Sequence, residues 1–245
     1  MIHGYDLVPQ ERQQMKKIEI PSNLTTLAYN SIKQHILEGR LDQDTKLTES
    51  RLSVQLGISR SPVREALNSL EAEGLIRIES RRGAFLKRFS AKEISDLYDL
   101  RQVLEVYAVR TAAITPGLLA DLEESVRRTR ELSKQDKKQE FIEEDMKFHG
   151  LITEATGNQL LCKFLANIQN QIWLCRCKTY NMSSSRAPGG HQAIIEALRD
   201  KDRRKAEFAM AEHIAYVRHK LVNLVSEQQS PTEIKSGPET ALPIE

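Results

Sequence analysis

The chain has 245 residues, of which 40% are hydrophobic and 29% are charged, so it is long enough for two ordinary globular domains and is not disordered as a whole. The formal net charge of +2 neither requires nor excludes a polyanionic partner. No apolar run approaches the roughly 20 residues of a membrane span, and three cysteines without paired spacing, together with no signal peptide, predict a cytoplasmic protein that is not bound to a membrane.

The N-terminal third has the pattern of three short helices and a hairpin. Residues 1–22 are polar and weakly patterned, which predicts a flexible segment. Apolar residues recur four apart from Leu24 to Ile36, a second helix fits 48–56, and a third begins after Ser59 and ends before Gly74. Alternating Ile76 and Ile78, a Ser-Arg-Arg-Gly turn and a second apolar run predict a β-hairpin. This order of elements predicts a winged helix-turn-helix over residues 23–88.

Basic and hydroxyl side chains crowd the start of the third helix, in the stretch "GISRSPVREAL". A helix that enters the major groove needs such side chains in its first turn, and residues 51–88 hold eight basic against four acidic residues. Each arginine alone could be a solvated surface charge. Together they predict a DNA-reading surface made of Ser59, Arg60, Ser61 and Arg64 on the helix, and Arg81, Arg82 and Gly83 at the hairpin tip.

The stretch "LTESRLSVQLGISRSPVREALNSLEAEGLIRIESRRGAFLK" resembles the winged helix-turn-helix of GntR-family transcriptional regulators, over about residues 24–88. Ser61 stands where the family usually has threonine, which keeps the hydroxyl. The resemblance implies that the DNA contacts are Arg60, Ser61 and Arg64, with Arg82 and Gly83 in the wing and Arg51 as a weaker phosphate contact.

From Ser90 onward every long segment has helical period, and the region opens with a capping box, Ser90-x-x-Glu93. One helix runs toward the Thr115-Pro116-Gly117 break. Others are predicted roughly over 118–133, 139–156, 158–181, 190–200 and 202–227. The expected fold is therefore mainly α, with an all-helical bundle of about six helices over residues 90–227. Residues 228–245, rich in proline, serine and charge, are expected to form a disordered tail.

Four polar residues interrupt the apolar stripes of three helices in this bundle. Asp145 and His149 lie four apart among Phe141, Ile142, Phe148 and Ile152, and His191 and His213 occupy similar positions on later helices. A single histidine on an apolar face is more often a hydrogen-bonded core residue than a ligand. Three imidazoles and a carboxylate directed at one interior instead predict a metal centre, with zinc as the first choice and nickel or manganese as alternatives. Glu143 and Glu144 are expected to be solvated.

The motifs "DLYDLRQVLEVYAVRTAA", "DMKFHGLITEATGNQLL", "HQAIIEALRDKD" and "MAEHI" resemble the FCD domain of FadR-type GntR regulators. The resemblance implies that Asp145, His149, His191 and His213 hold the metal. It also implies that Arg101 faces an effector pocket, where it would pair with a carboxylate; the alternative is a salt bridge to Glu105. The chain departs from the family at Gly190, where glutamate is usual, and at Lys201-Asp202, where Gly-Asp is usual.

Two further polar residues, Asn167 and Gln171, lie four apart and could line the same cavity, or could be ordinary exposed positions. The leading hypothesis is a homodimeric regulator, a repressor of transcription rather than an enzyme, whose affinity for double-stranded operator DNA responds to a small carboxylate bound beside the metal. The alternatives are a constitutive repressor with a structural metal, or a metal-dependent enzyme fused to a DNA-binding module. Against the enzyme, no HExxH motif accompanies the ligands.

Overall fold

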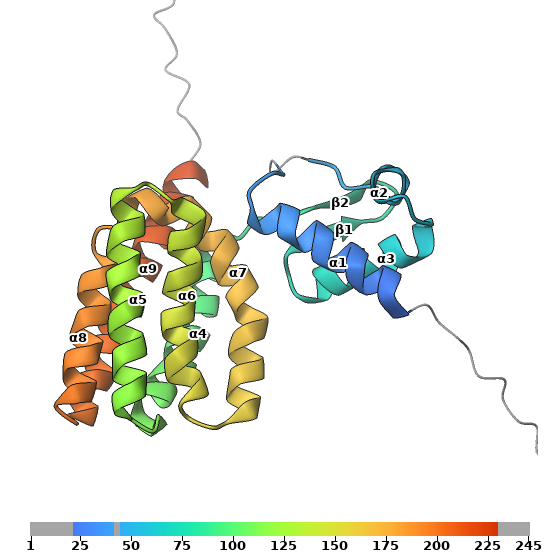
Figure 1. Ribbon diagram of the computed structural model, residues 1–245. Coiled ribbons are helices and arrows are strands. Elements are labelled where there is room, and N and C mark those ends of the chain that lie inside the picture. The colour runs from blue at the N-terminus through green and yellow to red at the C-terminus, as the bar shows by residue number, and fades with distance from the viewer. Residues whose placement is uncertain (1–21, 42–44, 230–245) are drawn as a thin grey trace, which may run out of the picture.

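The computed structural model describes residues 22–41 and 45–229, which form two units (Figure 1). The first unit is a winged helix-turn-helix, as predicted, with three helices and a two-stranded antiparallel sheet. Its elements are α1 (Ser22–Leu37), α2 (Glu49–Leu56), α3 (Arg60–Ala72), β1 (Ile76–Glu79) and β2 (Gly83–Leu86). The expected flexible segments, 1–22 and 228–245, lie outside the described residues except at the ends of α1 and α9.

Local signals explain where these elements begin and end. The Thr48 hydroxyl accepts a hydrogen bond from the Arg51 amide at the start of α2, and Gly57, with φ 65°, ends that helix in the left-handed region. Ser59 occupies the N-cap of α3, but its hydroxyl makes no capping hydrogen bond. It therefore remains available for another partner. In the hairpin Ile76 pairs with Leu86, which places the apolar side chains on the face that packs against the helices.

The second unit is a six-helix bundle, also as predicted. Its helices are α4 (Ala91–Thr111), α5 (Pro116–Lys134), α6 (Lys138–Glu154), α7 (Gln159–Ser183), α8 (Ala187–Arg199) and α9 (Arg203–Gln229). The capping box at Ser90 and Glu93 is formed in both directions, and Pro116 stands in the first turn of α5, where a missing amide hydrogen costs no hydrogen bond.

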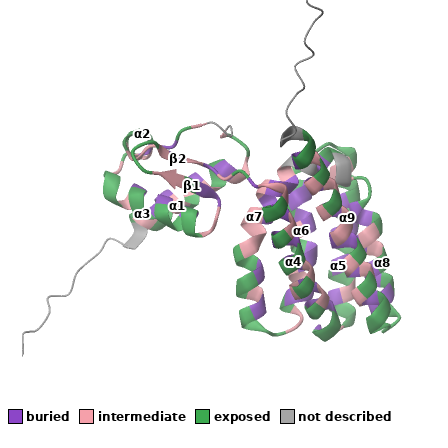
Figure 2. Ribbon diagram, turned by 180° about the vertical axis from the view of Figure 1, so that it is seen from behind, coloured by how far each residue is buried: buried purple, intermediate pink, exposed green. Residues whose placement is uncertain are grey.

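The bundle helices carry both buried and exposed residues along their length (Figure 2), and most of the buried apolar residues form one core cluster. Most are aliphatic, yet the interior also holds charged and imidazole side chains: Arg101, Glu105, Asp145, His149, Arg176, His191 and His213. Burial of so many ionisable groups is costly unless they are paired or bind a ligand. In the described part of the chain, none of the helices has the length and apolar character needed to cross a membrane.

The two units contact each other through α7, which lies on the side of the bundle that faces the winged helix-turn-helix (Figures 1 and 2). Trp173 on α7 donates a hydrogen bond from its indole to the carbonyl of Leu37 at the end of α1. Leu174 packs against the apolar cores of both units. The helix that covers the buried polar cluster therefore also holds the N-terminal unit.

Candidate metal centre and nucleic-acid interface

The N-terminal turn of α3 presents the predicted DNA-reading side chains to solvent. Arg60, Ser61 and Arg64 are all exposed there, as is Arg51 on α2. The guanidinium of Arg64 pairs with the carboxylate of Glu49 through two hydrogen bonds of 2.7 and 2.8 Å. The pair holds Arg64 at the junction of α2 and α3, with more than half of its side chain exposed.

The hairpin tip carries the second basic group. Arg81 adopts φ 62°, and Gly83 adopts φ 109°, a conformation that favours glycine. A Cβ at Gly83 would also lie 3.0 Å from the carbonyl oxygen of Leu47. Arg82 pairs with Glu79 at 2.5 Å. Like Arg81 it is exposed, so both side chains are accessible to a phosphate backbone beside the helix.

The four predicted metal ligands meet inside the bundle. Asp145 and His149 come from α6, His191 from α8 and His213 from α9, and their donor atoms all lie within 4.8 Å of one another. The Nε2 atoms of His149 and His191 are 3.3 Å apart, and they lie 3.9 and 3.6 Å from the two oxygens of Asp145. Bonds of about 2.1 Å place donors around one ion roughly 3 to 4 Å apart, so these separations fit a single divalent cation.

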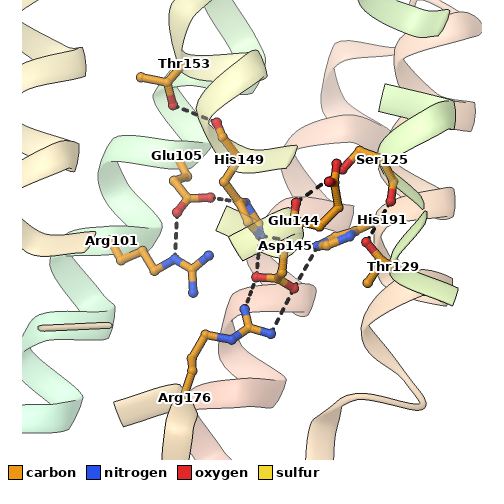
Figure 3. Close-up of polar contacts among 10 residues, drawn as sticks. All are labelled: Arg101, Glu105, Ser125, Thr129, Glu144, Asp145, His149, Thr153, Arg176 and His191. Carbon is orange, nitrogen blue, oxygen red and sulfur yellow. Dashed lines mark hydrogen bonds and ion pairs between the residues drawn. The ribbon is translucent and has the colours of Figure 1, made fainter. Parts of the chain in front are cut away.

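The orientation of His149 is set by a chain of buried polar contacts (Figure 3). Its Nδ1 lies 2.5 Å from Oε2 of Glu105, and Oε1 of Glu105 accepts a hydrogen bond of 2.6 Å from Nε of Arg101. Nδ1 faces this carboxylate, so Nε2 is the nitrogen that faces Asp145 and His191 and that would bind a metal ion. Carboxylates behind histidine ligands commonly fix them in this way.

His191 and His213 are held by close packing. The ring of His191 stacks on Phe148, with ring centroids 3.9 Å apart. A Cβ at Gly190 would lie 2.5 Å from Nδ1 of His213, so a residue with a side chain there would have to displace that imidazole. The glycine at position 190, one of the departures from the family pattern, therefore allows α8 and α9 to approach closely at the candidate metal ligands.

The protonation states also suit metal binding. Burial lowers the pKa of His191 and His213 well below the usual 6.5, and His149 lowers the pKa of both further, so both imidazoles are neutral at pH 7. Burial would raise the pKa of Asp145, but Arg176 and His149 hold it below its usual value. A neutral imidazole and an ionised carboxylate are the forms that ligate metals.

Arg176 is a site residue that the sequence reasoning missed. It lies on α7, is almost completely buried, and pairs through both terminal nitrogens with the carboxylate of Asp145, with Nη2 2.8 Å from Oδ1 (Figure 3). A signal for it was present, because Arg176 follows Leu165 and Ile172 at the spacing of one buried helix face. Like the histidines, it is a polar side chain on an otherwise apolar helix face.

The structure bears on three further sequence expectations, of which the one for Glu144 is wrong. Arg101 does form the salt bridge to Glu105, yet its Nη1 is buried with no hydrogen-bond partner among the described residues, so the two expected roles are compatible. Asn167 is exposed, as one of its two expected alternatives had it, and Gln171 hydrogen-bonds to the carbonyl oxygen of Glu73 of the winged helix-turn-helix at 3.1 Å. Glu144 is buried rather than solvated, and it pairs with Arg128 and Lys147.

Family comparisons divide the chain at the same place as the structure. Residues 24–86 match the family described as bacterial regulatory proteins, gntR family. Residues 96–216 match the FCD domain. The first range covers the winged helix-turn-helix and the second covers most of the bundle, including all four candidate metal ligands.

Similar proteins are transcriptional regulators. The Uxu operon regulator of Haemophilus influenzae is 30% identical over 218 residues, which cover 79% of this chain and 80% of that protein. The gluconate operon transcriptional repressor of Bacillus subtilis is 28% identical over 208 residues, covering 81% and 85%. A crystal structure of a GntR regulator from Rhodococcus sp. RHA1 aligns with a TM-score of 0.72 at 19% identity, covering 81% of this chain and 97% of that one, which shows a shared fold.

Proposed function

The chain belongs to the gntR family of bacterial regulatory proteins and combines its DNA-binding unit with an FCD domain; from this premise we propose that it is a repressor whose operator affinity is set by a small carboxylate bound beside a divalent metal ion. It is a transcriptional regulator and not an enzyme, since the family and its similar proteins are regulators. The specific proposals are the metal, the effector and the dimer.

The metal proposal rests on the donor set. Three imidazole nitrogens and one carboxylate oxygen suit zinc, with nickel and manganese as alternatives for the same ligands. All four candidate ligands are buried, and the Nε2 of His213 has no hydrogen-bond partner among the described residues. Buried polar atoms without partners are rare in folded proteins, so this atom favours a bound ion or ordered water at the cluster.

The observation that carries the effector proposal is the balance of buried charge. Arg101 and Arg176 are positive, Glu105 and Asp145 are negative, and imidazoles that ligate a metal ion are neutral, so with an ion bound the three histidines add no charge. The four charged side chains therefore cancel. Because a divalent ion would leave two uncompensated positive charges in the interior, the site favours an anion beside the metal.

The surroundings of the cluster offer this anion contacts of the right kind. Nη1 of Arg101 and the hydroxyl of Tyr98 are both buried without partners among the described residues. A guanidinium nitrogen and a phenol can each donate a hydrogen bond to a carboxylate. A pocket of about 510 Å³ between α8 and α9 also reaches His213 and carries Arg186 and Lys205 on its walls. Both sets of groups are chemically suited to a carboxylate, and one similar protein is the repressor of a gluconate operon.

The homodimer proposal rests on apolar side chains that no part of the described chain covers. Leu100, Val103 and Tyr107 are exposed on one face of α4, and Leu160 and Phe164 are exposed on α7, which packs against α4. A second copy that covered such faces would present two recognition helices to an operator of matching two-fold symmetry.

The test combines metal analysis with ligand screening of the purified protein. Zinc content is measured by mass spectrometry for the wild type and for His149→Asn and His213→Asn. Thermal shifts are then recorded for a panel of small mono- and dicarboxylates that includes gluconate, with zinc and with chelator. We expect one zinc per chain in the wild type alone, and a carboxylate that stabilises only the zinc form. Equal zinc content in the variants contradicts the site, and zinc binding without any stabilising carboxylate favours a structural metal.

A further inference from the structure

One helix, α7, connects the candidate metal centre to the end of the DNA-recognition helix. Towards its middle, Asn170 donates a hydrogen bond of 2.9 Å to Oε2 of Glu73, and Gln171 donates one of 3.1 Å to the carbonyl oxygen of Glu73. Six residues after Asn170, Arg176 pairs with Asp145. Six residues of helix span about 9 Å, so the two contacts are ends of one short rigid segment.

Glu73 is the residue that follows α3, and it is the meeting point of three helices. Its carboxylate also accepts hydrogen bonds from the hydroxyl of Tyr29 and from Nζ of Lys33, both on α1. The fit at this point is close, because a Cβ at Gly74 would lie 2.8 Å from Nε2 of Gln171. A displacement of α7 therefore acts on α1 and α3 together, through polar contacts that have a defined geometry.

A small displacement at Glu73 would produce a larger one at the side chains expected to contact DNA. The side chains expected to read bases stand at the other end of α3, which has 13 residues and is therefore about 20 Å long. A tilt of about 5° at Glu73 would move the first turn by roughly 2 Å, several times the range of about 0.5 Å over which hydrogen-bond lengths vary. Contacts with base edges depend on such distances.

We propose that α7 couples the metal centre to DNA binding. Arg176 responds to the metal through its contact with Asp145, and Asn170 and Gln171 pass the change to the DNA-binding unit through their contacts with Glu73. This inference rests on the proposed metal site. Asp145 engages Arg176 with both oxygens, so it must share them when it also serves as a ligand, and a divalent charge in the cluster repels the guanidinium. Both effects draw Arg176 away from Asp145. Because the buried Arg176 side chain has little room to move on its own, its displacement shifts α7, and Asn170 and Gln171 on the same helix transmit the shift to Glu73 and to the recognition helix.

A tryptophan in α7 provides an intrinsic fluorescence signal for this movement. Trp173 is the single tryptophan of the sequence, lies between the two ends of the segment, and hydrogen-bonds to Leu37 across the contact between the units. We expect its fluorescence emission to change as the full-length, chelator-treated protein is titrated with zinc, and to saturate at the stoichiometry of the bound metal. Emission that stays constant through saturation would overturn the proposal.

The decisive experiment separates coupling from binding. The probe is zinc alone, and the DNA is an operator fragment selected by the protein from a random-sequence pool. Operator affinity is measured with zinc and with chelator for the wild type, for Asn170→Ala/Gln171→Ala, and for Asn167→Ala, which changes an exposed asparagine on the same helix. We expect a zinc-dependent change in affinity of at least fivefold in the wild type and in Asn167→Ala, and less than twofold in the double variant, with equal zinc content in all three.

The outcomes distinguish this inference from the proposed function. Wild-type protein that binds zinc with no change in operator affinity, or a double variant that keeps the full change, refutes coupling through α7 and leaves the metal site intact. Wild-type protein that binds no zinc refutes the metal site, and the coupling with it.

Discussion

Arg176 and Asp145 form a buried ion pair in which both terminal nitrogens of the guanidinium meet both oxygens of the carboxylate. Each side chain is at most 2% exposed. The pair joins α7 to α6. Asp145 therefore contributes both to the packing of these helices and to the candidate metal centre.

The stability of this pair is testable by mutation. Arg176→Met should leave Asp145 as an uncompensated buried charge and lower the free energy of unfolding by about 3 to 5 kcal/mol. Arg176→Met/Asp145→Leu should recover most of that loss, because it removes the charge along with its partner. Urea denaturation in chelator measures both. A double variant that is less stable than Arg176→Met would show that the pair is not the cause.

The pH dependence of stability should reflect His191 and His213. Burial and neighbouring cations depress the pKa of both in the fold, whereas in the unfolded chain histidine titrates near 6.5. Below pH 6.5 the unfolded chain therefore binds more protons than the folded chain, and stability falls as pH falls. In chelator we expect a loss of about 1 kcal/mol per histidine between pH 7.5 and 5.5. His191→Asn/His213→Asn should show a smaller loss, and an identical loss would refute the assignment.

The DNA-reading role of α3 can be separated from general electrostatics. Arg60→Ala and Arg64→Ala should each weaken operator binding by about 1 to 3 kcal/mol if the arginines contact base edges. Arg82→Ala in the wing should instead reduce the salt dependence by about one phosphate contact, with less loss of specificity. Fluorescence anisotropy across a salt series distinguishes the two.

The matched control for these arginines is Arg127→Ala. Arg127 is an exposed arginine on α5 of the bundle, where it pairs with Glu124 and Glu131. Its removal changes the net charge by the same amount as the other variants. If Arg127→Ala weakened binding as much as Arg60→Ala, the effect would be one of overall charge.

The sequence predicted the helices well because their signals are local. The capping box at Ser90 and Glu93 marks where α4 begins, and the interruptions of apolar stripes at Asp145 and His149 mark residues that are buried despite their polarity. Such patterns depend only on residues within a few turns of one another. The fold class and the four candidate ligands could therefore be predicted.

What could not be predicted depends on contacts between segments far apart in the chain. Glu105 supports His149 from another helix, 44 positions earlier, and Gln171 meets Glu73 across nearly 100 residues. Spacing along α7 gave Gln171 and Asn167 the same face and suggested one cavity, because periodicity does not state which neighbour a face meets. Only the three-dimensional packing of the two units shows that Gln171 forms a hydrogen bond between them.

Gly190 offers a direct test of how closely α8 and α9 must approach at the metal ligands. In Gly190→Ala the new Cβ would lie 2.5 Å from Nδ1 of His213, so that imidazole must move and zinc affinity should fall at least tenfold, or about 1.4 kcal/mol. Gly189→Ala is the matched control, because a Cβ there meets no atom within 4 Å and should slightly stabilise the helix. Competition with a chromogenic chelator measures both affinities. Wild-type affinity in Gly190→Ala would mean that His213 does not depend on this contact, and weaker binding in both variants would point to a general effect on α8.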